Sequence, residues 1–243
     1  SPGASVSSRA VVGYPLGVLY GTGSKTNADG SFDLNSNGFP QITSSPIVLG
    51  DPNPDWRGGI SLNMRYKKFR LNAVLEHSHG GEFSPRTLWV LRRFGTTQET
   101  ANRLTLDQSL VNYRGTTVPA GTTVRGNIED FGGGPVLLDE NWYRTGIGGG
   151  FGDNQAYNFS IADATWTKLR DLSLSYVLDT PVIKNIGLND VILTFTGRDL
   201  ININNVDGID PEINTKGVSV AQGVEYFTNP QTKGFLFSLT INY

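Results

Sequence analysis

Apolar and polar residues alternate one by one in five segments of the chain, each about ten residues long. In the segments 58–66 and 69–79, apolar side chains take almost every second position, with Arg, Asn, Ser and Glu between them. A period of two predicts β-strands with one apolar and one polar face, and the two intervening residues, Lys67 and Lys68, predict a tight hairpin. The same alternation predicts three further strands, at 165–178, 190–199 and 234–243.

The third of these segments has a break in its alternation. Trp166 shares a phase with Leu172 and the later apolar residues, so we place Trp166 on the apolar face of this strand. Lys168 and Arg170 interrupt that phase near its start, and Leu169 falls in the opposite phase.

The links between the strands are very unequal in length. The first hairpin and the link at 179–189 are short, whereas about 80 residues follow His79 and the segment 201–232 is also long. Antiparallel strands reverse direction at every link, so the two short links fall at one end of the sheet and the two long ones at the other. Short turns at one rim and long loops at the opposite rim are typical of an outer-membrane β-barrel.

Strand length and aromatic positions also fit a membrane barrel. About ten residues at roughly 3.3 Å each, tilted near 45°, cover the apolar band of an outer membrane. A soluble β-sandwich has the same alternation, so the pattern of a single strand does not separate the two folds. Aromatic residues near the predicted strand ends indicate an interfacial girdle, with Tyr66, Phe69 and Tyr176 at the short-turn rim and Trp166 and Trp56 toward the other rim.

The final strand favours the barrel over the sandwich. Its apolar residues take every second position up to the last residue of the sequence: Phe235, Phe237, Leu239, Ile241 and Tyr243. Termini of soluble domains usually fray, whereas a barrel closes its hydrogen-bonded seam with its last strand. We therefore predict that these residues form a terminal barrel strand that is read during assembly.

The amino-acid composition excludes several classes of function. The 243 residues carry 20 Lys and Arg against 22 Asp and Glu, a net charge of −2, so there is no basic excess for binding nucleic acid. The lack of cysteine excludes a disulfide scaffold, a thiol nucleophile and a cysteine-ligated metal. No apolar run reaches 18 residues, so no transmembrane helix is predicted.

Candidate catalytic and metal-binding residues are few. His77 and His79 lie at a strand end, where solvated rim residues are a more common arrangement than a metal site. The acidic run 204–212, which includes Asp210, lacks the spacing of an EF-hand loop and is interpreted as a turn. We predict no catalytic residue, no metal site and no cofactor, and therefore a protein that is not an enzyme.

The long segment after the second strand is predicted to contain a short helix. Ser84 and Pro85 form a helix start, and Gly95 stands where a helix-ending glycine is expected. Thr96 and Glu99 have the spacing of a capping box for a second helix.

Three aromatic residues of the long segment are candidate ligand contacts: Trp89, Trp142 and Tyr143. Their ring faces are able to stack on sugar rings. Packing of the loop against other parts of the protein is an equally good interpretation of the same residues.

Six motifs follow one another along the chain: LGDPNPDW at 49–56, YKKF at 66–69, ADATWTKLRDLSLSY at 162–176, GRDL at 197–200, GIDPE at 208–212 and NPQT at 229–232. Taken in this order, they resemble the SusC/RagA group of TonB-dependent outer-membrane transporters. The resemblance covers roughly residues 10–243. It departs from the family where Arg198 and Asp199 replace a more usual Gln-Asn pair, and the long loop is not recognisable residue by residue.

The resemblance implies a 22-stranded transmembrane antiparallel β-barrel with a plug and with long extracellular loops that carry a short helix. Five or six strands cannot close even the smallest membrane barrel of eight. We therefore expect this chain to be the C-terminal part of a larger all-β barrel protein. As partners the family implies the rest of the barrel and its plug, a SusD-like surface lipoprotein, the TonB complex and the lipid bilayer, with no nucleic acid.

This interpretation divides the chain into four segments and places its C-terminus on the periplasmic side of a bacterial outer membrane. The segments are an extracellular loop region at 1–57 with a candidate strand at 11–20, a transmembrane hairpin at 58–79, a long extracellular loop with a short helix at 80–161, and the last three barrel strands at 162–243, with a periplasmic turn at 179–189 and an extracellular loop at 201–232.

Two classes of function stay open. The first is a barrel segment of a TonB-dependent importer of oligosaccharides or peptides. The second is a non-transport module, either a soluble glycan-binding β-domain or a structural barrel of a secretion assembly. The ordered motifs and the terminal strand favour the importer.

Overall fold

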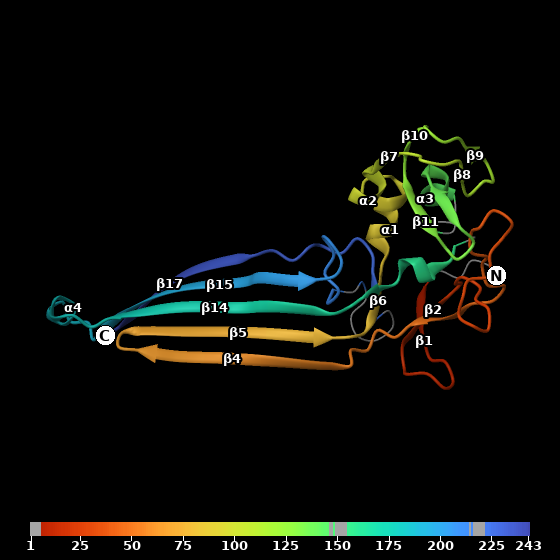
Figure 1. Cartoon of the computed structure of the whole chain (residues 1–243). Helices are drawn as coiled ribbons and strands as arrows, with labels where there is room; N and C mark the ends of the chain where they lie inside the picture. Colours follow the sequence, from red (N-terminus) through yellow and green to blue (C-terminus); the bar gives the residue numbers. More distant parts are fainter. Residues whose placement is uncertain (1–5, 146–147, 149–154, 214, 216–221) are drawn as a thin grey trace. The chain divides into compact units, whose positions relative to one another are not determined.

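The computed structural model describes residues 6–145, 148, 155–213, 215 and 222–243 (Figure 1). The chain forms two compact units, which are described separately below. Each unit is built from three separate stretches of chain: the first from Ser1–Asn53, Gly81–Asp163 and Pro211–Thr228, and the second from Pro54–Gly80, Ala164–Asp210 and Asn229–Tyr243.

The second unit is a five-stranded sheet in which every neighbouring pair is antiparallel (Figure 1). The spatial order is β17-β15-β14-β5-β4. All five strands were predicted from the alternation, and β15 extends five residues further than expected. Their bounds are β4 (Trp56–Tyr66), β5 (Phe69–His79), β14 (Trp166–Leu178), β15 (Asp190–Asn204) and β17 (Gly234–Asn242).

The strand register aligns residues of like polarity into rows across the sheet. Leu174 of β14 pairs with Leu71 of β5 and with Phe195 of β15, and Phe195 pairs with Phe237 of β17. The neighbouring row is polar and contains Ser175 and Thr194, whose hydroxyl groups share a hydrogen bond of 2.8 Å. Successive side chains of a strand point to opposite faces, so the sheet has one apolar and one polar face.

The predicted face of Trp166 is wrong, because the strands β14 and β15 contain a β-bulge. Leu169 pairs with Ile201, but Asp171 pairs with Arg198, so Arg170 is an extra residue on β14 and two extra residues lie on β15. One inserted residue reverses the alternation of every position before it. Trp166 and Lys168 therefore lie on the polar face, and Leu169 lies on the apolar face, opposite to the predicted arrangement.

The short links at one end of the sheet have distinct local structures. Lys67 in the β4–β5 turn has a positive φ of 53°, and Lys68 forms an ion pair with Asp179 at 2.5 Å. This contact lowers the pKa of Asp179 and raises the pKa of Lys68. The link after Asp179 contains a short helix, α4 (Pro181–Asn185), with Pro181 in its first turn.

The first unit contains several small sheets in place of one large one. The candidate strand at 11–20 is only partly correct, since 11–17 is a loop between two strands. The three-stranded sheets are β1 (Ser7–Arg9), β2 (Val18–Gly21) and β3 (Ile47–Gly50), and β13 (Ala162–Asp163), β6 (Glu82–Pro85) and β16 (Val224–Glu225). The two-stranded sheets are β7 (Arg103–Thr105) with β10 (Thr123–Arg125), β8 (Leu110–Val111) with β9 (Thr117–Val118), and β11 (Asn127–Asp130) with β12 (Pro135–Leu138).

Helices of the first unit are short, and their starts differ from the prediction. Helix α1 (Arg86–Arg93) begins after Pro85, and no side chain caps it, whereas Ser84 belongs to β6. Gly95 follows the end of α1 with a φ of 70°. The second predicted helix is reduced to α2 (Gln98–Ala101), which Thr97 caps in place of Thr96. The remaining helices are α3 (Glu140–Thr145) and the 3-10 helix η1 (Tyr157–Ser160).

Several buried clusters of large side chains hold the first unit together, two of them rich in aromatic residues. One is aromatic, with the ring of Phe39 5.5 Å from that of Trp142 and 5.3 Å from that of Tyr113. The other joins Leu19 to Trp89 and Tyr157. No helix among the described residues is long and apolar enough to cross a bilayer.

Candidate functional site

The apolar face of the sheet is exposed along its whole length. Phe237 is 80% exposed, and each of the other four strands also carries exposed, large apolar side chains on this face. Exposed apolar patches larger than a few hundred Å² mark surfaces that contact a partner or a membrane. The exposed apolar side chains of this face include Ile60, Leu62, Met64, Leu75, Leu174, Leu193, Phe195, Ile201, Phe235, Leu239 and Ile241.

Four of the five predicted girdle residues lie on this apolar face, near strand ends. Tyr66 pairs with Phe69 across the hairpin, and the Phe69 ring lies 4.7 Å from that of Tyr176. Trp56 lies at the opposite end of the same hairpin, with its ring 4.9 Å from that of His77. The fifth, Trp166, is on the polar face and only 4% exposed, because of the bulge.

Strand β17 contains the predicted terminal residues Phe235, Phe237, Leu239 and Ile241, and Tyr243 follows it. It pairs with β15 on one side, and no other described strand pairs with its second edge. The backbone donors and acceptors of that edge are open to another strand. Strand β4 has the same position at the other edge of the sheet.

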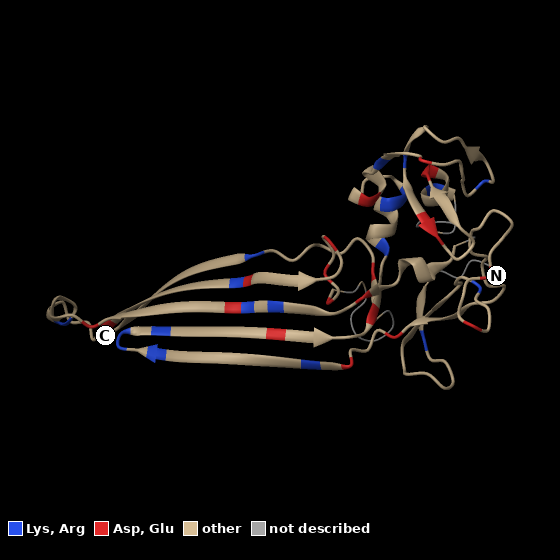
Figure 2. Cartoon of the chain, viewed as in Figure 1, with Lys and Arg blue, Asp and Glu red and all other residues tan. Residues whose placement is uncertain are grey.

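A charged band crosses β5, β14 and β15 at the bulge (Figure 2). Arg170 donates from Nε to Oε2 of Glu76 at 2.8 Å, and its Nη1 lies 3.6 Å from Oδ1 of Asp199. Asp199 has a φ of 50°, a conformation that is costly for a residue with a side chain. The bulge thus places one guanidinium between two carboxylates from the neighbouring strands.

Lys168 forms a buried ion pair beside this band. Its side chain is 1% exposed, and its Nζ donates to Oδ2 of Asp210 at 2.6 Å and to Oε1 of Gln231 at 3.3 Å. Asn202 also donates to Asp210, at 3.2 Å. Asp210 was interpreted from the sequence only as part of a turn, although a lysine in the apolar phase of a strand was a signal that a buried partner exists.

The histidines at the end of β5 lie against aromatic and hydroxyl groups. His77 shares a hydrogen bond of 2.8 Å from Nδ1 to Oγ1 of Thr167, and His79 lies 5.8 Å from the Trp56 ring. Within the described part of the chain, no three His, Asp or Glu side chains converge as metal ligands would.

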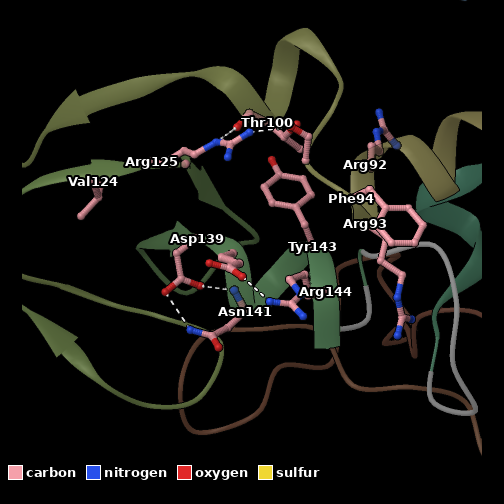
Figure 3. A pocket seen from close by; sticks show the side chains of 13 residues that line it. Arg92, Arg93, Phe94, Thr100, Val124, Arg125, Asp139, Asn141, Tyr143 and Arg144 are labelled. Atoms are coloured by element: carbon pink, nitrogen blue, oxygen red, sulfur yellow. Dashed lines mark hydrogen bonds and ion pairs between the residues drawn. The ribbon is translucent and has the colours of Figure 1, made fainter.

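The predicted ligand-contact aromatics take two different positions. Trp89 is 2% exposed and stacks on Tyr157, and Trp142 is 4% exposed within the aromatic cluster. Their ring faces are covered by protein, so neither indole offers a stacking surface in this conformation. Tyr143 lines a pocket of about 430 Å³ in the first unit (Figure 3).

This pocket lies between α1, α2, β10 and α3, with Tyr143 at its centre (Figure 3). The Tyr143 hydroxyl donates to Oε1 of Glu99 at 3.2 Å and accepts from Nδ2 of Asn127 at 2.8 Å. Burial, together with the Glu99 carboxylate, raises the pKa of Tyr143, so its hydroxyl stays neutral. Four arginines also line the pocket: Arg92, Arg93, Arg125 and Arg144. Sequence reasoning did not single them out, because the three elements that carry them are far apart along the chain.

An antiparallel sheet with one exposed apolar face is the arrangement found in the wall of a membrane β-barrel. The chain was compared with known proteins. No family model matches the chain. The chain is 25% identical over 216 residues to "TonB-dependent receptor P3" of Formosa agariphila, covering 87% of this chain and 18% of that protein.

Two solved structures have a similar fold. The RagAB peptide importer in its "closed-closed" state matches with a TM-score of 0.52 at 14% identity, over 95% of this chain and 24% of the RagAB chain. The RagAB peptide transporter matches with a TM-score of 0.53 at 16% identity, over 95% of this chain and 23% of that one. The sequence resemblance to TonB-dependent transporters of the SusC/RagA type is confirmed. The chain spans a quarter or less of the length of these relatives.

Proposed function

We propose that this chain is part of the barrel wall and the extracellular loops of a TonB-dependent outer-membrane importer. The observation that carries the proposal is the five-stranded sheet with an exposed apolar face and a polar, hydrogen-bonded reverse face. The apolar face would contact lipid, and each Å² of apolar surface removed from water contributes roughly 25 cal/mol. The polar face, with its paired charges, would line the lumen.

The two open sheet edges support a larger, closed barrel. An unpaired strand edge in lipid leaves backbone groups unsatisfied at several kcal/mol each. Further strands would pair with β4 and β17, and in a 22-stranded barrel this chain would supply the last strands. The short links beside Lys68 and Asp179 would face the periplasm together with the C-terminus, and the first unit would be extracellular.

The cargo and partners are proposed by resemblance to the similar proteins. RagAB is a peptide importer, which supports peptides as cargo. Oligosaccharides as the other candidate cargo, a SusD-like lipoprotein as the partner and TonB as the source of energy are proposed from the resemblance of the sequence motifs. The segments would then be those predicted: a loop region at 1–57, a transmembrane hairpin at 58–79, a loop at 80–161 and the last three strands within 162–243. Binding and passage of cargo need no catalytic residue, cofactor or metal, and we propose that the protein is not an enzyme.

Deletion of Phe235–Tyr243 from the full-length protein tests the proposal. Loss of the terminal strand opens the barrel, so we expect the variant to lose its folded, heat-modifiable band on gels and to be absent from the outer-membrane fraction. Deletion of Val11–Tyr14, in the loop between β1 and β2, leaves a four-residue connection between the paired strands; it is the control and should leave assembly intact.

Wild-type protein from the same preparation should enter detergent extracts and copurify with a surface lipoprotein. Recovery of the deletion variant as a correctly assembled outer-membrane barrel would contradict the terminal-strand assignment. A water-soluble wild-type protein would instead favour the soluble glycan-binding β-domain. An assembled barrel without cargo uptake would favour the structural barrel of a secretion assembly.

A further inference from the structure

The pocket in the first unit is lined by four arginines from three elements. Arg92 and Arg93 are the last residues of α1, Arg125 ends β10, and Arg144 lies in α3 (Figure 3). Two carboxylates, Asp139 and Glu140, also line it. Cationic groups therefore outnumber anionic ones around the cavity.

Three of these guanidinium groups already have partners. Arg92 donates from Nε to Oε2 of Glu99 at 2.7 Å, and Arg144 donates from Nη1 to Oε1 of Glu140 at 2.5 Å. Arg125 donates to backbone carbonyl oxygens, those of Thr100 and Gly95, at 2.5 Å each. The charge of Arg125 is thus held in place by neutral acceptors, and no carboxylate among the described residues forms an ion pair with it.

The Asp139 carboxylate is committed to protein donors. Its Oδ1 accepts from the backbone N–H of Asn141 at 2.9 Å, at the start of α3. Its Oδ2 accepts from the side-chain amides of Asn112 at 2.8 Å and Asn141 at 3.0 Å. These three hydrogen bonds stabilise the start of the helix and leave this carboxylate poorly placed to pair with an arginine.

Arg93 has no ion pair or hydrogen bond with any residue that the structure describes, although it is only partly exposed. A cation at the end of α1 favours the helix dipole by about 0.3–1 kcal/mol. Arg92 already has this position, and the dipole does not account for Arg125 and Arg144 meeting at the same cavity from other elements.

We propose that this pocket binds a carboxylate group of a ligand and that Arg93 is the residue that pairs with it. The planar fork of an arginine matches a carboxylate through two parallel hydrogen bonds, and Arg125 adds an unbalanced positive charge. A volume of about 430 Å³ lies within the range of small-ligand pockets. The Phe94 ring at its edge is 74% exposed and offers an apolar face beside the charge.

Two kinds of cargo carry such a group in their repeating units: acidic sugars and peptides with acidic side chains. This inference deepens the proposed importer function, since the carboxylate would belong to its cargo. Binding is measured without transport, so the two proposals can fail separately.

Isothermal titration of the full-length protein in detergent tests the site. The probes are trigalacturonate and a triglutamate peptide with acetylated N-terminus and amidated C-terminus. Each has an uncharged counterpart, the methyl-esterified trigalacturonate and the triglutamine peptide with the same blocked ends. The variants are Arg93→Gln, which removes the charge, and Arg93→Lys, which keeps the charge but loses the fork. The matched control is Arg114→Gln, an exposed arginine of the same unit outside the pocket lining.

We expect at least one acidic probe to bind more tightly than its uncharged counterpart. Arg93→Gln should weaken that binding about tenfold or more, Arg93→Lys should weaken it less, and Arg114→Gln should leave it unchanged. Because Arg93 forms no ion pair or hydrogen bond with the described residues, these variants should fold normally. The probe that binds identifies the ligand as an acidic sugar or an acidic peptide.

Equal affinity for charged and uncharged probes, no binding of either acidic probe, or no effect of Arg93→Gln would overturn the inference. Heat modifiability of the same samples reports on barrel assembly. A correctly assembled barrel with no carboxylate binding overturns the pocket alone and leaves the importer proposal standing.

Discussion

At the scale of single residues, Lys168 is a charged side chain that depends on its buried partners. Moving an ammonium group from water into protein costs several kcal/mol, which its partners must offset. Asp210 supplies the opposite charge, and Gln231 and Asn202 satisfy further hydrogen-bonding capacity. Asp210 and Gln231 lie toward opposite ends of the segment between β15 and β17, so the ion pair and its hydrogen bonds join both ends of that segment to the sheet.

Removal of one member of this ion pair should be strongly destabilising. Lys168→Met leaves the Asp210 carboxylate buried without its cation, and we expect the free energy of unfolding to fall by about 3–5 kcal/mol. Urea unfolding of the full-length protein in detergent measures the change. Lys233→Met, at an exposed lysine, is the control and should change it by less than about 0.5 kcal/mol.

The double variant Lys168→Met with Asp210→Asn measures the interaction between the two charges separately from their interactions with other groups. It should be less destabilised than the sum of the two single variants, because no unpaired charge is left behind. Additive losses would show that the two charges do not depend on each other.

At the scale of elements, the turns and bulges decide how the strands meet. Of the two residues in the β4–β5 turn, only Lys67 has a positive φ, which is the pattern of a type II′ turn and favours glycine at that position. At the bulge, Asp199 is held in a similar conformation beside Arg170. Both lysine and aspartate carry a backbone cost of about 1–2 kcal/mol at such positions.

Lys67→Gly should therefore stabilise the hairpin. Relief of the left-handed conformation outweighs the added freedom of glycine in the unfolded chain, and we expect a gain of about 0.5–1 kcal/mol in the free energy of unfolding. Urea unfolding of the full-length protein measures the gain.

Lys68→Gly is the matched control and should have the opposite sign, because Lys68 has an ordinary φ and pairs with Asp179. The pKa of Asp179 is lowered from 3.8 in the folded state, so the contribution of the pair is present above that ordinary value. It is lost as the pH falls through the lowered pKa. The deficit of Lys68→Gly should shrink in acid, and a gain in stability for this variant would argue against the turn assignment.

At the scale of the whole molecule, the sheet separates two environments. One face presents apolar side chains to its surroundings, and the other joins its strands through hydroxyl contacts such as Ser173 with Thr196 at 3.0 Å. In a barrel these faces would meet lipid and lumen, respectively. Of two adjacent residues in one strand, the residue on the lumen face should then tolerate a charge, and the residue on the lipid face should not.

Adjacent positions of β17 test this assignment. Phe237→Arg would place a charge in the apolar band at a cost of about 2–4 kcal/mol, whereas Ser238→Arg would place it on the polar face at little cost. We expect the first variant to assemble poorly into vesicles and to unfold at lower urea concentration, and the second to resemble the wild type. If Ser238→Arg were instead the more damaging variant, the lipid and lumen faces would have to be assigned the other way round.

Local alternation in the sequence was sufficient to predict the five strands and the composition of most rows of the sheet. The row from Met64 to Phe237 follows directly, because a strand repeats every two residues and no inserted residue intervenes. The ordered motifs likewise predicted the relationship to TonB-dependent transporters, since they are local patterns of residues. The hairpin at Lys67 was also readable from its two-residue length.

Only the tertiary structure decided the positions that depend on contacts between distant segments. Trp166 changed face because the bulge becomes visible only when β14 is paired with β15. Asp210 is 42 residues from Lys168, and no local pattern joins them. The arginine pocket likewise gathers three elements that follow one another at wide spacing. Periodicity reports the local environment of a residue, whereas ion pairs and cavities depend on how the chain folds back on itself.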